Sequence, residues 1–268
     1  MTTATTLTPR PGVLTRLRYA GQDTATMLWR DTLRTARQPE MLVFAVVMGV
    51  FFLVLFNYVF GGAIGAGADI AYLQFLVPGV FVITALQGAQ QTSLGLATDL
   101  AEGVTDRFRS LPMSQVAVIA GRTLADAVRN VVGLVLVALL ALVMGYRFSS
   151  FAGAVAAIAL AAAVGFAFSW LGAAIAAWIR QPDMVGMLSM FWLFPLMLAS
   201  TAFAPADSMP GWLQPFATYQ PISVAADAVR GLCDGSATSA ELGLAAAWIL
   251  GLLIVFGPLS VHLYTTTD

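Results

Sequence analysis

Long apolar stretches alternate with short charged segments along this chain. No Asp, Glu, Lys or Arg lies within six stretches, 41–68, 70–98, 130–146, 148–179, 184–206 and 242–267. A helix that spans a membrane needs about 20 mainly apolar residues, and all but the third stretch exceed that length. The pattern therefore predicts an all-α polytopic membrane protein with six transmembrane helices.

The expected transmembrane helices follow these stretches. They span Met41–Phe60, Phe75–Thr98, Val118–Met144, Phe151–Ile179, Val185–Phe203 and Leu242–Tyr264. The third apolar run is short, so we extend that helix backwards through Arg122, Asp126 and Arg129, which recur at helical spacing and share one face. There the carboxylate can pair with either arginine near the cytoplasmic interface. An ion-binding site in this cluster is the alternative.

The arginines predict the orientation of the helices. Short cytoplasmic loops retain positive charge during insertion, and with the N-terminus inside, eleven of the 13 arginines are cytoplasmic. Only Arg147 and Arg230 then lie outside. We therefore expect both termini in the cytoplasm and the protein in the cytoplasmic membrane of a bacterium. The first forty residues hold six arginines and no apolar run long enough for a signal peptide, so we expect no cleavage.

The segment before the first span reads as an amphipathic helix. Thr24–Arg37 combines apolar positions with Arg30 and Arg34, and Pro39 should end the helix before the membrane. Such a helix would lie on the inner leaflet as an elbow, although a plain basic flank is the alternative. Residues 1–40 are thus expected to form a cytoplasmic N-terminus, and residues 41–268 one transmembrane domain.

Two connecting segments look specialised. The cytoplasmic segment 99–121 places Phe108, Leu111 and Met113 among charged residues, which favours a docking helix over a solvated linker. The outer segment 204–241 is interrupted by prolines and contains three aromatic residues, Trp212, Phe216 and Tyr219. This composition predicts two short re-entrant helices in the outer leaflet between spans five and six, with a loose loop as the alternative.

Polar and small residues recur inside two spans. In the second span the polar side chains are Thr84, Gln87, Gln91 and Thr98, with Gly95 on the same face. Amides in hydrocarbon need partners, so this stripe either packs against another helix or lines a translocation path. In the fourth span small residues recur every four positions, at Ala161, Gly165, Ser169, Ala173 and Ala177, which predicts close helix packing. Pro195 should kink the fifth span.

The composition of the chain argues against several kinds of partner and catalytic site. The chain is 59% hydrophobic and 10% charged with a net charge of −1, which gives no case for a nucleic-acid partner. It contains no lysine, so it cannot form a phosphate-binding loop ending in Gly-Lys-Ser/Thr. One histidine, His262, and one cysteine, Cys233, argue against a zinc-protease site and exclude an intrachain disulfide. We therefore expect a protein that is not an enzyme and binds no cofactor itself.

Several short motifs resemble one family of membrane proteins. They are Arg37-Gln-Pro-Glu40, Phe60-Gly-Gly-Ala-Ile64, Phe75-Leu-Val-Pro-Gly79, the stretch from Glu102 to Ser114 followed by Gly121-Arg122 and Asp126, and Asp227-Ala-Val-Arg-Gly231 after Trp212 and Pro221. With six expected spans, the chain resembles a type-two ABC exporter permease of the daunorubicin-resistance subgroup. One departure is Gly49, where related chains often carry proline, so we expect a softer kink in the first helix.

The resemblance implies a function and partners. Two permeases, identical or homologous, would form the membrane unit, and two copies of a separate ATP-binding subunit would dock beneath it and use ATP and Mg. The resemblance implies that the ATPase-coupling residues are Glu102, Gly103, Asp106, Arg107, Phe108, Arg109, Leu111 and Pro112. Thr84, Gln87 and Gln91 are the candidate path residues. The expected function is outward transport of a hydrophobic drug or lipid; the alternatives are an ATP-independent carrier or channel subunit, and a membrane scaffold.

Overall fold

The computed structural model describes residues 47, 49–51, 53–56, 69–103 and 115–266. Over this part of the chain all regular structure is helical, and the residues described between 47 and 56 are also helical. The elements are α3 (Asp69–Ala101), α5 (Gln115–Val143), α6 (Phe151–Ile179), α7 (Pro182–Leu198), η1 (Ala206–Ser208), α8 (Gln214–Tyr219), α9 (Pro221–Asp234) and α10 (Ser239–Thr266). The all-α class is confirmed.

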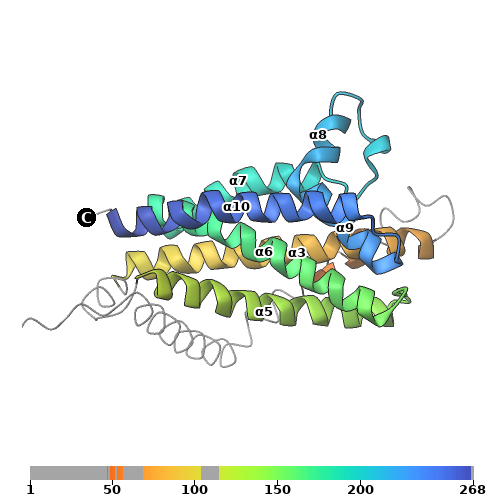
Figure 1. The fold of residues 1–268 in the computed structure, drawn as a ribbon, viewed down its shortest axis with the longest axis horizontal. Coiled ribbons are helices and arrows are strands. Elements are labelled where there is room, and N and C mark those ends of the chain that lie inside the picture. Colours follow the sequence, from red (N-terminus) through yellow and green to blue (C-terminus); the bar gives the residue numbers. More distant parts are fainter. Residues whose placement is uncertain (1–46, 48, 52, 57–68, 104–114, 267–268) are drawn as a thin grey trace, which may run out of the picture.

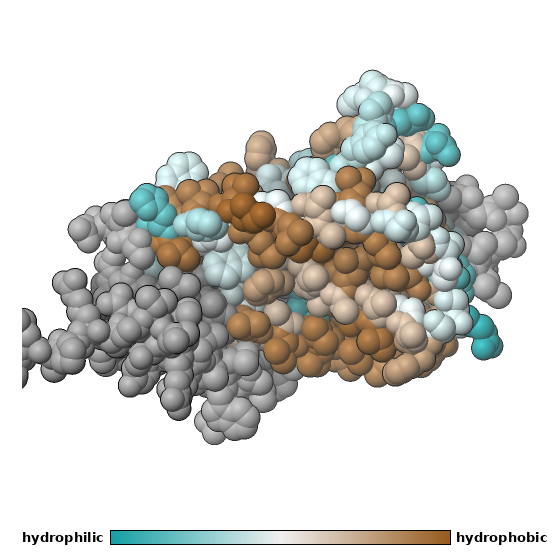
Figure 2. Space-filling view, viewed as in Figure 1, coloured by the Kyte–Doolittle hydropathy of each residue, from teal (hydrophilic) through white to brown (hydrophobic). Residues whose placement is uncertain are grey.

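The long helices form a bundle with two distinct ends (Figure 1). The helices α3, α5, α6, α7 and α10 run along the long axis, and α8 and α9 lie toward the end where α5 connects to α6. Four helical stretches are long and apolar enough to cross a membrane, 72–101, 123–143, 151–179 and 239–264. They match the predicted second, third, fourth and sixth spans. Figure 2 shows hydrophobic side chains gathered over the middle of the bundle.

Other predicted elements lie partly or wholly outside the described residues. The elbow helix and most of the first span belong to this group. The connection between α3 and α5, which is predicted to be cytoplasmic, is shorter than the predicted 99–121, because α3 continues to Ala101 and α5 already begins at Gln115. Between α7 and α10 the structure contains the two predicted outer helices, α8 and α9, as well as the short turn η1.

The predicted end of the fifth span is wrong. We expected Val185–Phe203, but α7 ends at Leu198. The residues that follow are apolar because they are buried in protein, not because they continue a helix: Ala202 is 0% exposed and Phe203 is 6% exposed. The Ser200 hydroxyl donates to the Met197 carbonyl at 2.6 Å and ends the helix locally. Apolarity alone could not separate a buried turn from a membrane helix.

The central helix is α3, and one asparagine joins it to two neighbours. Asn130 of α5 donates its side-chain amide to the Ala85 carbonyl of α3 at 3.0 Å. Two glycines make room for it, since a methyl group on Gly88 or on Gly165 would lie 2.7 Å from Asn130 atoms. The amide thus satisfies its donor at the point where α3, α5 and α6 meet.

The small-residue stripe in α6 is a packing surface, as predicted. All five of its residues, Ala161, Gly165, Ser169, Ala173 and Ala177, are buried. A methyl group on Gly165 would also lie 2.8 Å from the Ala85 carbonyl oxygen, so the backbones of α6 and α3 approach closely there. This close contact holds α6 against the central helix α3.

Candidate functional site

Two of the predicted coupling residues, Glu102 and Gly103, directly follow α3. The Glu102 amide donates to the Thr98 carbonyl at 2.9 Å, and Gly103 adopts a left-handed conformation with φ 68° that ends the helix. Glu102 is exposed. The remaining coupling residues, Asp106, Arg107, Phe108, Arg109, Leu111 and Pro112, lie outside the described residues.

The three candidate path residues differ in exposure. Thr84 is 4% exposed, and its hydroxyl oxygen would lie 3.6 Å from a methyl group on Gly49 in the first helix. Gln87 is half-buried and Gln91 is exposed. In this conformation Thr84 therefore packs against a neighbouring helix, whereas the two glutamines of the stripe remain accessible from outside the described bundle.

The predicted charge cluster on α5 is present in part. Arg129 forms an ion pair with Asp126 at 2.8 Å, and the two side chains are 17% and 11% exposed. The other carboxylate oxygen of Asp126 is buried and has no partner among the described residues. It lines a polar cavity of about 10 Å³ with Thr92, Thr123 and Ser169, which is room for one water molecule. Because Arg129 already neutralises the carboxylate, this cavity offers little to a cation.

A second charged cluster lies at the opposite end, where α9 meets α3. We call it the outer clamp, after the side of the membrane that the sequence predicts for it, and its members are Phe75, Thr201, Asp227 and Arg230. The Arg230 guanidinium forms an ion pair with Asp227, donates to the Thr201 carbonyl at 3.0 Å and to the Phe75 carbonyl at 3.3 Å, and lies 3.9 Å from the centre of the Phe75 ring. One arginine thus binds three elements together, through charge, carbonyl dipoles and a ring face.

Neighbouring hydrogen bonds reinforce the outer clamp by holding the turn after α7. The Thr201 hydroxyl donates to Asp227 at 3.0 Å, and the Thr201 amide donates to the Ser223 hydroxyl at 3.0 Å. Gln220 donates to the Leu196 carbonyl at 3.0 Å and to the Ala199 carbonyl at 2.7 Å, which caps the end of α7. Two carbonyl groups at the end of α7 are therefore bound by one side chain, that of Gln220, the residue that precedes α9.

Close backbone contact brings the same turn onto α3. A methyl group on Gly79 would lie only 2.0 Å from the Ala202 carbonyl oxygen, so glycine is required there. The Tyr72 hydroxyl donates to the Phe203 carbonyl at 3.0 Å. Two motifs far apart in the sequence, Phe75–Gly79 and Asp227–Gly231, thus meet at one place in the structure. Spacing alone gave no signal for this contact, because Phe75 and Arg230 are 155 residues apart.

Burial shifts the pKa values of the ionisable groups in and next to the outer clamp. Desolvation raises the pKa of Asp227 and lowers the pKa of Arg230, while their mutual attraction opposes both shifts. Cys233, one turn further along α9, is 1% exposed, and burial raises the pKa of its thiol to about 11.

The aromatic residues Trp212, Phe216 and Tyr219 are exposed, as their predicted place at a membrane interface requires. Within the described residues, no group of three His, Cys, Asp or Glu side chains could hold a metal ion.

Comparison with known proteins identifies the family. The ABC-2 type transporter family matches residues 22–233. The chain is 37% identical over 242 residues to the daunorubicin resistance ABC transporter permease protein DrrB1 of Streptomyces coeruleorubidus, a match that covers 90% of this chain and 85% of that protein. It is also 25% identical to the probable doxorubicin resistance ABC transporter permease protein DrrC of Mycobacterium tuberculosis, over 83% of this chain and 80% of that one.

A more distant relative is the putative transport permease ycf38 of Cyanophora paradoxa, which is 23% identical over 80% of this chain and 75% of its own length. The family match includes the whole region from α3 through most of α9, and so contains the outer clamp and both ends of the connection between α3 and α5. The chain therefore belongs to the ABC-2 type transporter family and is a permease similar to those of the daunorubicin-resistance group.

Proposed function

We propose that this chain is the membrane subunit of an ATP-driven exporter that moves a hydrophobic or amphipathic compound, a drug or a lipid, outward across the cytoplasmic membrane of a bacterium. The observation that carries this proposal is the similarity to a daunorubicin resistance permease along 90% of the chain. The apolar helical bundle supports it, because such a bundle can surround a path through the bilayer.

The energy for transport comes, in this proposal, from another chain. Two copies of an ATP-binding subunit, which use ATP and Mg, dock against the segment that contains Phe108 and Leu111. The chain has no lysine with which to form a phosphate-binding loop of its own. A second permease, identical or homologous, completes the membrane unit, and both termini of each permease lie in the cytoplasm.

The path is proposed to follow the accessible part of the polar stripe on α3. Of the three candidate path residues, Gln87 and Gln91 are left accessible by the described bundle, whereas Thr84 is buried. Amide groups exposed at membrane depth are costly unless water, protein or a substrate contacts them. A second permease placed against this face would supply the opposite wall.

Affinity purification tests the partnership directly. A tagged chain expressed in its own host should retain a soluble protein whose sequence contains the Gly-Lys-Ser/Thr phosphate-binding loop, and addition of ATP with vanadate should inhibit transport by that complex. Retention of no such ATPase, together with transport that depends on an ion gradient, would instead indicate a secondary carrier and would reject the proposal.

A further inference from the structure

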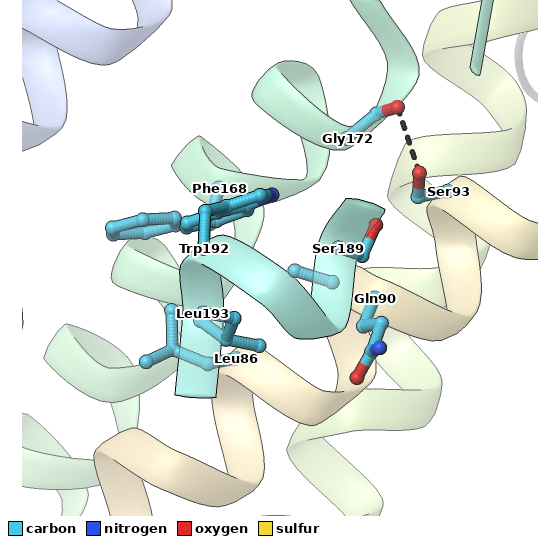
Figure 3. Close-up of a pocket in the computed structure, with 9 residues that line it drawn as sticks. Leu86, Gln90, Ser93, Phe168, Gly172, Ser189, Trp192 and Leu193 are labelled. Atoms are coloured by element: carbon cyan, nitrogen blue, oxygen red, sulfur yellow. Dashed lines mark hydrogen bonds between the residues drawn. The ribbon is translucent and has the colours of Figure 1, made fainter. Parts of the chain in front are cut away.

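A small pocket lies between α3, α6 and α7, away from the polar stripe (Figure 3). Leu86 and Gln90 of α3, Phe168 of α6, and Ser189, Trp192 and Leu193 of α7 line it. The volume of the pocket is about 10 Å³, which is room for a chemical group the size of one water molecule. Gln90 and Trp192 are only half-buried, so the pocket opens to the outside of the described bundle between α3 and α7.

One uncommitted hydrogen-bond donor lies in this pocket. The indole nitrogen of Trp192 is buried and has no partner among the described residues. In Figure 3 it lies at the edge of the ring that faces the space between Gly172 and Ser189. The nearby Ser93 hydroxyl is already used, because it donates to the Gly172 carbonyl at 2.8 Å. A buried donor without an acceptor is unfavourable, so the pocket is built to receive an acceptor.

The other walls of the pocket suit an apolar molecule. The Trp192 ring stacks on Phe168 with centroids 6.1 Å apart and planes 9° from parallel, and Leu86 and Leu193 extend the apolar surface. The pocket lies in the middle third of α3, roughly 17 Å along the helix from Ala101 at 1.5 Å per residue. Ester groups of bilayer lipids lie near the two faces of the membrane, so they are remote from this depth.

We propose that this pocket is a binding site for an amphiphile dissolved in the membrane, and that Trp192 donates its indole N–H to a carbonyl or ether oxygen of that molecule. The oxygen occupies the pocket, and the apolar body lies at its mouth, against the half-buried side chains of Trp192 and Gln90. The site would supply the exporter with its substrate, and this role rests on the proposed function. Binding itself does not, because it needs neither ATP nor a partner.

The full chain in lipid nanodiscs provides the test, read through the indole N–H resonances of its six tryptophans. Trp192→Phe retains an aromatic ring against Phe168 and identifies the Trp192 resonance by its loss. Titration with methyl laurate, an apolar ester, should move that proton downfield to saturation. Dodecane, which lacks an acceptor, should not move it. Trp170 is the matched control, since its indole nitrogen is also buried without a partner in the described part of the chain but Trp170 does not line the pocket.

Four outcomes of the NMR experiment would each contradict the proposal. No shift, an equal shift at Trp192 and Trp170, or the same shift with dodecane would overturn the proposal. A cross-peak between the Trp192 proton and water that persists at saturating ester would show a hydration site only, and would also overturn it. In a complex that exports a carbonyl-bearing compound, Trp192→Phe should weaken apparent affinity about tenfold, the loss of one hydrogen bond, while Trp170→Phe should leave it unchanged.

Discussion

Replacement of Arg230 by methionine tests the outer clamp. Methionine keeps an apolar stem of similar length but removes the ion pair with Asp227, the hydrogen bonds to the Phe75 and Thr201 carbonyls, and the contact with the Phe75 ring. Loss of one partner from a buried ion pair costs about 3 to 5 kcal/mol. The Arg230 side chain is 17% exposed but that of Asp227 is 38% exposed, so we take the lower end, about 3 kcal/mol.

The single cysteine of the chain reports the consequence. Cys233 is 1% exposed on α9, and its raised pKa further suppresses the reactive thiolate while α9 is in place. A thiol reagent that cannot cross membranes should therefore react only when α9 opens locally. A change of about 3 kcal/mol in the free energy of opening predicts labelling roughly a hundredfold faster in Arg230→Met than in the parent chain, measured by mass shift over time.

Two controls make this prediction specific. Arg147→Met removes an exposed arginine at the same end of the bundle and should leave the labelling rate unchanged. Asp227→Asn retains an acceptor for the guanidinium and for the Thr201 hydroxyl, so its effect should be several-fold at most. If Arg230→Met labels within twofold of the parent chain, or if Arg147→Met accelerates labelling equally, Arg230 does not hold α9 in place.

Three further predictions concern the topology, the path and the coupling segment. In a cysteine-free background, a cysteine at Asp207 should react with an impermeant reagent from outside and one at Arg109 only from inside; the reverse pattern would invert the orientation. Gln91→Leu should reduce export without loss of complex assembly, whereas lost assembly would indicate a packing role. Phe108→Ala with Leu111→Ala should insert normally, bind the ATPase more weakly by about 2 kcal/mol per anchor, and abolish export; normal export and normal retention of the ATPase would contradict the coupling role.

Elements bounded by charges were predictable from the sequence. The predicted fourth span, Phe151–Ile179, has the same bounds as α6, because charged residues flank the apolar run and the Ser150 hydroxyl caps the helix by accepting from the Gly153 amide at 3.0 Å. The pairing of Asp126 with Arg129 was equally local, since helical spacing places the two side chains within reach. Both the bounds of α6 and this ion pair are determined by residues only a few positions away in the sequence.

Contacts between distant segments were not predictable in this way. Asp227 and Arg230 were selected through family resemblance, but their partner Phe75 is remote in sequence. Gln90 lies outside the polar stripe of α3, and no feature of the sequence distinguishes Trp192 from the other apolar residues of its span. Only the packing of α7 against α3 and α6 shows that the indole nitrogen of Trp192 is buried and has no partner within the residues that the structure describes.

Transport by purified components tests the central claim most directly. The permease and its co-purified ATPase would be reconstituted in vesicles, and daunorubicin, the compound named in the closely matching relative, would be followed by fluorescence. We predict uptake into those vesicles whose ATPase faces outward, dependent on ATP and Mg and abolished by vanadate. Uptake that persists without ATP and follows an imposed ion gradient would contradict the assignment of this chain as the membrane subunit of an ATP-driven exporter.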